Sequence, residues 1–362
     1  MINPAIAHLR LHNQHISAPS FQKPEEVVRW MGAVQAQEYF GALWAVGLRM
    51  QRAAAADVEQ AMADGRIIRT HPMRDTWHFV AADDIHWLLT LMAPGRIARN
   101  GPWYRKLELD ETTIASSHAI FTKTLQGKKS LIRRELAAAL EQAGISTKGL
   151  RLTFLLARAE IEGVICSGPR RGKQFTYRLL DELVPVYKTL DREEAIAELA
   201  RRYFTSHGPA TAQDFVWWSG LKVSEARAGL EAVKSGLTHE VIDGQTYWRS
   251  PSSSPAQELA ETVYLLPSYD EYTVSYKDRS AIFDGPRASQ LERETTILNP
   301  TIVINGRVVG LWTRAMQKDA VIITPKLFTP LDQAEKQAIT APAECYAAFF
   351  GAKSVNLSFQ VA

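Results

Sequence analysis

Two glutamines lie two residues apart in the stretch GAVQAQEYFG, residues 32–41. In a helix the side chains of Gln35 and Gln37 would point about 200° apart around the axis and could not act on one target. In an extended segment both amides would point to the same side. Because Gly32 is typical of a helix end, we expect residues 34–37 to be extended and the two amides to share a face.

A pair of carboxamides limits the chemistry that this segment can perform. Each amide offers donor and acceptor groups, so the two together could hold one water molecule in a fixed orientation. An amide cannot act as a strong general base, and this restricts the bonds that it could help to break. The pair therefore suits a reaction that depends on the position of a water rather than on strong base catalysis.

The elements around this segment follow an order that repeats three times, helices and then a two-stranded hairpin. Such a unit is typical of a winged helix, a helix-turn-helix variant whose hairpin forms the wing. The predicted helices are residues 24–34 and 56–65, then 130–144 and 149–163, then 195–208, 211–221 and 224–236. The predicted hairpins turn at Arg74–Asp75, in the basic segment PRRGK (169–173), and at Asp243–Gly244.

The composition changes after Pro251, where SPSSSPAQ (250–257) reads as a linker. Strand patterns follow in TVYLLPSYDEYTV, TIVINGRVVGLWTR and DAVIITPKL, with the hairpin signal Asn305–Gly306 and one helix near 331–349. We predict an α+β protein with three tandem winged-helix units and a C-terminal β-rich, barrel-like domain. The expected boundaries are 1–125, with helices after the first wing, 126–190, 191–252 and 256–362.

Composition narrows the class of protein. With 362 residues and 46% hydrophobic content, the chain can bury a large core, and it has neither an apolar run long enough to span a membrane nor a secretory signal pattern. We expect a cytoplasmic protein with no membrane partner. The two cysteines, Cys166 and Cys345, support neither a disulfide framework nor a metal site.

The placement of basic residues says more about partners than the net charge of +3. Lysine and arginine collect in four segments, each expected in or beside a turn, with Gly, Pro, Trp and Tyr interleaved. Any one segment could be a solvated loop, but four together favour an extended phosphate-binding surface. The segments are residues 66–74, 94–106, 168–173 and 275–280.

Five blocks of the chain together resemble the AlkZ-like and YcaQ-like DNA glycosylases, in the order found in that family. The blocks are MGAVQAQEYFGALWAVGLR, RDTWHFVAADDIHWL, RYFTSHGPATAQDFVWWSGL, YLLPSYDEYTVSYKDR and VINGRVVGLWTR, and the resemblance covers roughly residues 3–360. It implies a monofunctional glycosylase, without a cofactor, that removes N-alkylated purines such as N7-alkylguanine from double-stranded DNA. Some members of the family unhook interstrand crosslinks, and we expect a monomer.

The family's catalytic motif, glutamine, an apolar residue, then glutamine or aspartate, falls on Gln35, Ala36 and Gln37. Cleavage of a glycosidic bond passes through an oxocarbenium-like state. A purine alkylated at N7 or N3 is already cationic, so its departure needs little acid assistance. Positioning a water and stabilising charge through amide dipoles can then be enough, whereas a normal base would remain uncleaved.

Ten further residues are predicted to contact DNA or to border the site. Strand alternation predicts that at least one of Trp77 and His78 faces the core. Asp270 could steady an oxocarbenium ion or bind Arg279 or Lys277. The basic second wing is a predicted phosphate-binding element. The full set is Arg74, Trp77, His78, Arg170, Arg171, Lys173, Tyr269, Asp270, Lys277 and Arg279.

Three other functions are weighed against the glycosylase prediction. Winged helices also serve as protein-interaction modules. A winged-helix transcriptional regulator without enzymatic activity would need a helix rich in base-reading side chains, and SEARAGLEAVKSG offers only Arg227 and Lys234. A hydrolase with a nucleophilic serine or cysteine would need a motif such as G-x-S-x-G, which the chain does not contain.

Trp217 and Trp218, within an apolar helix, are expected in the core rather than against bases.

Overall fold

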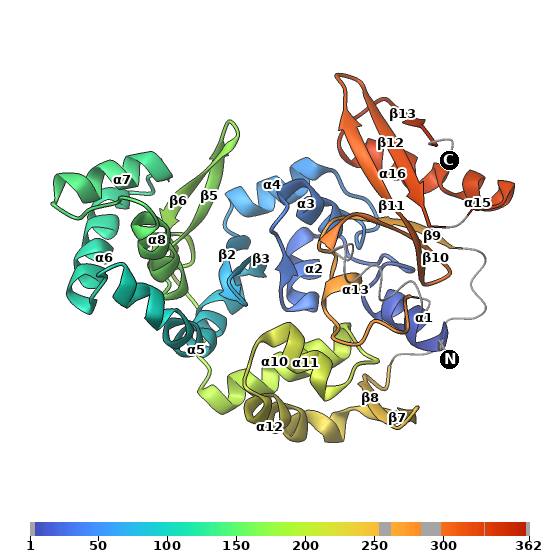
Figure 1. Ribbon diagram of the computed structural model, residues 1–362, viewed down its shortest axis with the longest axis horizontal. Coiled ribbons are helices and arrows are strands. Elements are labelled where there is room, and N and C mark those ends of the chain that lie inside the picture. Colours follow the sequence, from blue (N-terminus) through green and yellow to red (C-terminus); the bar gives the residue numbers. More distant parts are fainter. Residues whose placement is uncertain (1–3, 253–261, 284–297, 329, 360–362) are drawn as a thin grey trace. The chain divides into compact units, whose positions relative to one another are not determined.

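A computed structural model describes residues 4–252, 262–283, 298–328 and 330–359, and it mixes α-helices with β-strands (Figure 1). The chain forms two compact units. Unit 1 comprises Met1–Val58 and Ala197–Ala362, and unit 2 comprises Glu59–Ile196. The α+β class is confirmed, and the division into four domains stays a prediction. The predicted linker at 250–257 lies largely outside the described residues.

Unit 1 begins with short helices and contains the third predicted hairpin. Helix α11 starts with the capping box that Thr211 and Asp214 form, because each side chain accepts the other's backbone N–H, at 3.1 and 2.9 Å. Its elements up to residue 252 are α1 (Pro4–Asn13), α2 (Pro24–Met31), β1 (Val34–Gln35), α3 (Tyr39–Gly47), α10 (Arg192–Ser206), α11 (Ala212–Ser219), α12 (Val223–Val233), the 3₁₀ turn Lys234–Gly236, β7 (Thr238–Ile242) and β8 (Gln245–Arg249). The helices α4 (Ala55–Ala63) and α10 contain the unit boundaries.

The C-terminal part of unit 1 contains a curled five-stranded sheet with the strand order β13-β12-β11-β10-β9 (Figure 1). Its strands are antiparallel except for the parallel β12–β13 pair. Asn305 and Gly306 turn the β10–β11 hairpin with φ of 50° and 79°, as predicted. The elements are β9 (Val263–Leu266), α13 (Glu271–Val274), β10 (Thr301–Ile304), β11 (Arg307–Met316), β12 (Ala320–Leu327), α15 (Gln333–Ala338), α16 (Thr340–Phe349) and β13 (Ser354–Leu357).

Two sequence predictions for this part are wrong in detail. The strand pattern in residues 262–274 ends at Leu266, and residues 271–274 form the helical turn α13 instead. The cause is Asp270, whose carboxylate accepts the Tyr272 N–H at 2.9 Å and so begins a helix. The single helix expected near 331–349 is two helices, α15 and α16, which break at Ile339; a capping box of Asp332 and Glu335 starts α15.

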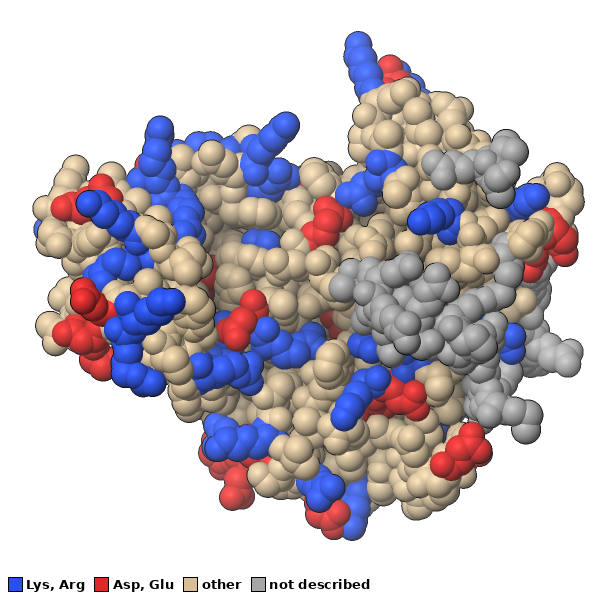
Figure 2. All heavy atoms as spheres, in the orientation of Figure 1, with Lys and Arg blue, Asp and Glu red and all other residues tan. Residues whose placement is uncertain are grey.

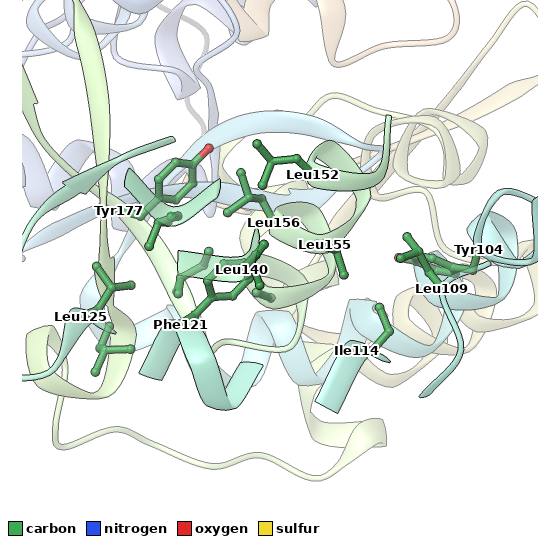
Figure 3. Packing of buried hydrophobic residues seen from close by; sticks show 14 residues of the cluster. Tyr104, Leu109, Ile114, Phe121, Leu125, Leu140, Leu152, Leu155, Leu156 and Tyr177 are labelled. Atoms are coloured by element: carbon green, nitrogen blue, oxygen red, sulfur yellow. The ribbon is translucent and has the colours of Figure 1, made fainter. Parts of the chain in front are cut away.

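Unit 2 contains two hairpins, and its apolar core is formed by four helices, α5 to α8, and the second hairpin. Leucines of α6, α7 and α8 contact one another there, with Phe121 and Tyr177 beside them (Figure 3). Its elements are β2 (Ile67–Met73), β3 (Thr76–Ala81), the 3₁₀ turn Ala82–Asp84, α5 (Ile85–Lys106), α6 (Glu111–Leu125), β4 (Leu131–Ile132), α7 (Arg133–Gln142), α8 (Arg151–Ile161), β5 (Ile165–Arg171), β6 (Gln174–Leu179) and α9 (Leu180–Leu183). The basic segment 94–106 lies inside α5, so its assignment to a turn is wrong; Pro94 and Pro102 are accommodated within this long helix.

The three predicted hairpins are present at the predicted positions. Arg74 and Asp75 both have positive φ, 52° and 59°, and Asp243 and Gly244 have 49° and 77°, as a two-residue hairpin turn requires. Gly172, with φ of 61°, lies in the turn of the basic hairpin β5–β6. Each hairpin follows helices along the chain. The identification of these units as three tandem winged helices stays a prediction.

Helix α3 is fixed to the C-terminal sheet by its indole and by close packing. The Nε1–H of Trp44 donates to the Leu265 carbonyl oxygen at 2.7 Å. A Cβ on Gly47 would lie 2.3 Å from a Phe349 ring carbon, so only glycine allows α16 to pack this closely. These contacts give the segment before α3 a rigid base. In the part of the chain that the structure describes, no helix is both long and apolar enough to cross a membrane.

Candidate active site and basic hairpins

The glutamine segment follows directly after a helix that stops at a glycine. Helix α2 ends at Met31, and Gly32 has a φ of 76° while its N–H donates to the Arg29 carbonyl oxygen. Val34 and Gln35 are extended, as predicted, but the strand ends there, and Gln37 lies in a bend before α3, so the prediction of an extended segment over 34–37 is wrong at Gln37. The side chain of Gln35 is buried to 8% exposure, and Gln37 is exposed. The segment therefore combines one buried glutamine with one that faces solvent.

Glu38 ends the segment and begins α3. Its carboxylate accepts the backbone N–H groups of Phe40 and Gly41, at 3.2 and 2.6 Å, which caps the helix. The same carboxylate lies 3.3 Å from the guanidinium of Arg314 on β11. A Cβ on Gly41 would lie 3.2 Å from Pro267, so the helix start packs closely against the loop that precedes α13.

Glu271, the first residue of α13, is fully buried and contacts the glutamine segment directly. Its Oε1 accepts the backbone N–H of Gln35 at 2.7 Å. Its Oε2 accepts the indole N–H of Trp218 at 3.0 Å and the hydroxyl of Ser275. The Nε2 atom of His207 lies 3.6 Å from the same oxygen. A buried carboxylate thus lies behind the strand that carries Gln35.

Asp270 is also fully buried, and its partner is not the one expected. The sequence suggested Arg279 or Lys277, but the carboxylate accepts two hydrogen bonds from Arg49, each 3.0 Å long. It also caps α13. With no exposed surface, the side chain of Asp270 is not available to DNA, and its contacts are structural.

The residues around this acidic pair differ in exposure. Tyr269 is half-buried and has a φ of 60°, a strained conformation for a residue other than glycine. The side chain of Lys277 is exposed, while Arg279 is buried, donates to the Thr273 carbonyl oxygen at 3.0 Å and lies over the ring of Trp217. Of these residues, Tyr269 and Lys277 have a surface that a ligand can reach.

The two adjacent tryptophans of α11 have different environments. Trp218 is fully buried, as predicted, and its indole bonds to Glu271. Trp217 is 45% exposed, so its assignment to the core is wrong. Its indole N–H donates to the Val274 carbonyl oxygen at 2.9 Å. Consecutive helical residues point about 100° apart, so Trp217 faces partly toward the surface while Trp218 faces the core.

An arginine of the first hairpin of unit 2 contacts one aromatic ring on each of the two hairpins. The guanidinium of Arg69 lies 3.9 Å from the centre of the Trp77 ring and 4.2 Å from that of Phe175 on β6. Trp77 is half-buried, whereas His78 is fully buried with its Nδ1 2.9 Å from the Thr76 carbonyl oxygen. The expectation that at least one of the pair faces the core is confirmed, and His78 has no exposed side chain for a DNA contact.

The turn of this hairpin is fixed by acidic and basic groups. Asp75 accepts a hydrogen bond from Arg96 Nε on α5 at 2.8 Å. Arg99, also on α5, lies 3.8 Å from the same carboxylate. Arg74 is half-buried beside Asp75 at the turn. Basic side chains from β2–β3 and α5 therefore meet at this end of the hairpin.

The second hairpin carries its basic residues at its free end, where Lys and Arg side chains gather (Figure 2). Arg171 is 53% exposed, with hydrogen bonds to Glu135 at 2.9 Å and to the Ser130 carbonyl oxygen at 2.6 Å. Arg170 is half-buried with its guanidinium 5.6 Å from the Phe175 ring centre, and Lys173 is exposed. These charges lie on a rigid strand pair, which suits binding to a backbone of phosphates.

Sequence reasoning missed the residues that support the site rather than form its surface. Arg49 lies in one of the resembling blocks, but nothing local shows that its partner is Asp270, 221 residues away. Glu271 is not among the residues that the sequence singled out, and its bond to Gln35 spans 236 residues. The one available signal was the pair of adjacent acidic residues at the end of the short loop that follows β9. As for the cysteines, burial raises the pKa of the Cys166 thiol to about 12, so it is no nucleophile.

Comparison with known proteins decides the family. A family model described as DNA glycosylase AlkZ-like matches residues 28–349, which include the glutamine segment, both acidic residues and both hairpins of unit 2. The chain belongs to the AlkZ-like DNA glycosylase family. This AlkZ-like protein is accordingly a DNA N-glycosylase, as the five sequence blocks predicted.

Two comparisons agree with this identification. The AlkZ-like chain is 26% identical over 352 residues to the interstrand DNA cross-link repair glycosylase of Streptomyces sahachiroi, which covers 91% of this chain and 92% of the relative. It also resembles the solved structure of Streptomyces sahachiroi DNA glycosylase AlkZ with a TM-score of 0.80 and 21% identity, over 99% of this chain and 100% of that one. The second likeness shows a shared fold.

Proposed function

We propose that this glycosylase hydrolyses the N-glycosidic bond of N-alkylated purines such as N7-alkylguanine in double-stranded DNA, with Gln35 and Gln37 as its catalytic residues. The observation that carries the proposal is the glutamine–apolar–glutamine pattern directly after the helix end at Gly32, with Gln35 on strand β1 and Gln37 exposed, in a chain of a DNA glycosylase family. The strand ends at Gln35 and Gln37 lies in the bend before α3. We propose that the two amides, two residues apart, are directed at one water between them.

The proposed mechanism uses orientation rather than strong acid or base. The alkylated purine carries a positive charge and leaves without prior protonation, and the sugar becomes oxocarbenium-like. The two amide oxygens orient a water toward the anomeric carbon, and their dipoles stabilise the positive charge that develops there. A neutral, unmodified purine is a poor leaving group without acid assistance, so normal DNA stays intact.

The proposal includes crosslinked substrates. The curated relative is named an interstrand DNA cross-link repair glycosylase, and it covers most of this chain. A crosslinked base is tethered to the opposite strand and cannot swing freely into a closed pocket, in contrast to the usual extruded base. We infer that the segment 35–37, with Gln37 exposed, acts on a base that remains close to the duplex.

Exposed basic groups supply the proposed contacts to the DNA backbone. In unit 2 these are the free end of β5–β6 and the turn of β2–β3, and in unit 1 Lys277, while the half-buried Tyr269 is proposed as an uncharged contact. Phosphate contacts fix orientation and carry little sequence information, as a repair enzyme requires. The helix-plus-hairpin units are proposed to be three tandem winged helices, and the protein is proposed to act as a monomer in the cytoplasm.

A direct assay tests the function. Duplex DNA with a single N7-methylguanine is incubated with excess protein and then treated with alkali, which breaks the strand at an abasic site. We expect a break at the modified guanine only, and no break at an unmodified guanine in the same sequence. Tight binding to the duplex without any excision would contradict the proposal and favour a winged-helix regulator.

A further inference from the structure

The buried carboxylate of Glu271 is aimed at the backbone of the proposed catalytic segment. Strand β1 is only two residues long, so it has little regular structure of its own to fix its backbone. Within unit 1, the Oε1 atom of Glu271 accepts the Gln35 N–H at 2.7 Å, with both residues buried. The direction in which the Gln35 side chain leaves the backbone depends on the orientation of this peptide unit.

The other oxygen of Glu271 is fixed by two donors of different kinds. The indole N–H of Trp218 lies at 3.0 Å, and the Ser275 hydroxyl also donates to it. A backbone amide and an indole can donate but not accept, so this set of partners suits the ionised carboxylate rather than a protonated acid. The carboxylate therefore has no freedom to rotate away from Gln35 without losing hydrogen bonds in a region that excludes water.

The position of Glu271 along the chain is fixed as well. It is the first residue of α13, and Asp270 before it caps that helix while pairing with Arg49. Arg49 also donates to the Ala45 carbonyl oxygen at 2.8 Å, which links the pair to the end of α3. The segment 35–37 is followed directly by Glu38, which begins α3. Glu271 contacts this segment at Gln35, and Asp270 contacts the end of α3 through Arg49, so the acidic pair connects α13 to both.

We propose that Glu271 is a positioning residue of the glycosylase, which holds the Gln35 peptide unit so that the Gln35 amide stays directed at the attacking water. The inference rests on the proposed roles of Gln35 and Gln37. Glu271 acts through Gln35 and makes no contact with the substrate, because its side chain is fully buried. Its removal should slow the chemical step and leave the affinity for DNA unchanged.

The test compares Glu271→Gln with Gln35→Ala and with the double variant. The substituted glutamine keeps the size of the side chain, but its NH₂ group would lie against N–H or O–H donors and could not accept their hydrogen bonds. We expect single-turnover excision of N7-methylguanine by Glu271→Gln to slow by about 10- to 100-fold, since small misplacements of reacting groups have effects of this size. Duplex binding should stay within about twofold. In the double variant the loss should be close to that of Gln35→Ala alone, because coupled residues are not additive.

A matched control separates positioning from general damage. Glu198→Gln is the same substitution in the same unit, and it removes a carboxylate bonded to Arg201 and Arg202. We expect it to lower stability and to leave the excision rate of the folded protein unchanged. If Glu271→Gln does not fold, Trp218→Phe keeps an aromatic ring and removes the indole N–H donor to Oε2 together with part of the ring, while the Ser275 hydroxyl still donates. This variant should slow excision by about three- to tenfold.

Each outcome decides between the proposals. If Gln35→Ala is slow while folded Glu271→Gln, or Trp218→Phe in its place, excises at the wild-type rate, the positioning role is wrong and the proposed function stands. If the losses of Gln35→Ala and Glu271→Gln multiply in the double variant, Glu271 acts independently of Gln35 and the inference is overturned. If Gln35→Ala itself is fully active, the proposed role of Gln35 is wrong.

Discussion

Arg49 and Asp270 form a buried ion pair with two hydrogen bonds of 3.0 Å, and their side chains are 1% and 0% exposed. The same guanidinium also bonds to a neutral side chain: Arg49 Nη2 donates to Gln14 Oε1 at 2.8 Å. Gln14 in turn donates to the Tyr276 hydroxyl at 2.9 Å. Segments from both ends of the chain therefore meet at one buried polar cluster in unit 1.

Removing one charge of this pair should destabilise the protein severely. In Asp270→Asn, the guanidinium of Arg49 would stay buried without a negative charge beside it. One of the two oxygens that accept its hydrogen bonds would be replaced by an NH₂ group. Breaking a buried pair in this way typically costs about 3 to 5 kcal/mol of unfolding free energy. Urea unfolding followed by circular dichroism measures this loss.

An exposed pair provides the comparison. Lys353 and Asp319 are 3.2 Å apart, with side chains 80% and 57% exposed. Asp319→Asn should change the unfolding free energy by no more than about 0.5 kcal/mol, because solvent screens such pairs. Equal losses in the two variants would show that burial does not set the strength of the Arg49–Asp270 pair.

The features that sequence analysis predicted are those that depend on neighbouring residues. Asp243–Gly244 and Asn305–Gly306 specify their turns because these residue types accept positive φ. The helix stop at Gly32 and the extended Gln35 follow from the same local chemistry. Hydrophobic periodicity supplied most of the helices, since a buried face repeats every three to four residues.

The features that were missed depend on contacts between distant parts of the chain. Residues 94–106 contain Gly and Pro, which favour a turn locally, yet the buried face of α5 packs into unit 2 and keeps the segment helical. Trp217 has an apolar sequence context like that of Trp218, and only the orientation of α11 leaves it exposed. The partner of Asp270 was chosen wrongly because nearby basic residues were the only ones that sequence could suggest.

The second hairpin should control the salt dependence of DNA binding. Arg170, Arg171 and Lys173 lie at or near its free end, so changing all three to alanine should reduce the slope of log affinity against log salt by about 2 to 3, close to one for each phosphate that is no longer neutralised. Binding should weaken alike for all sequences. Fluorescence anisotropy of an undamaged duplex over a series of salt concentrations measures both quantities.

Lys353→Ala serves as the control, since Lys353 lies beside β13 and pairs with Asp319. We expect this variant to keep the wild-type slope. An unchanged slope in the triple variant would mean that the β5–β6 hairpin does not touch the DNA backbone.

Acidification should destabilise the protein through His207. Burial lowers the pKa of its imidazole below 6.5, with Arg49 acting in the same direction and Glu271 and Asp270 opposing it. The unfolded chain then binds more protons than the folded one between the two pKa values. Stability is therefore fully present above about pH 6.5 and falls as the pH decreases toward the lower, folded-state pKa.

Thermal melts over the range from about pH 7.5 to 5.5 test this sign. His207→Gln should flatten the decrease in Tm on acidification, whereas His239→Gln, at an exposed position on β7, should not. A Tm that rises as the pH decreases through this range would show that the charged imidazole is favoured in the folded state, in contradiction to its burial.

The two glutamines provide the most specific prediction. Gln35→Ala or Gln37→Ala should slow single-turnover excision of N7-methylguanine by about 10- to 1000-fold, equivalent to about 1.4 to 4 kcal/mol of barrier. DNA affinity should hardly change, because neither amide is proposed to bind the backbone. Alkali-induced strand breaks at the modified site measure the rate, and Gln22→Ala, an exposed glutamine before α2, serves as the control.

The chemistry of the pair can be separated from its mere presence. Gln37→Asp reproduces the other motif of the family and adds a carboxylate that can act as a base or as a counter-charge to the oxocarbenium ion, so substantial activity should remain. Because the proposed mechanism uses no lysine nucleophile, borohydride should trap no covalent adduct between protein and DNA, and the product should be an intact abasic site. Full excision by the Gln35→Ala, Gln37→Ala double variant would overturn this mechanism, since no group would then remain in the segment to orient the water.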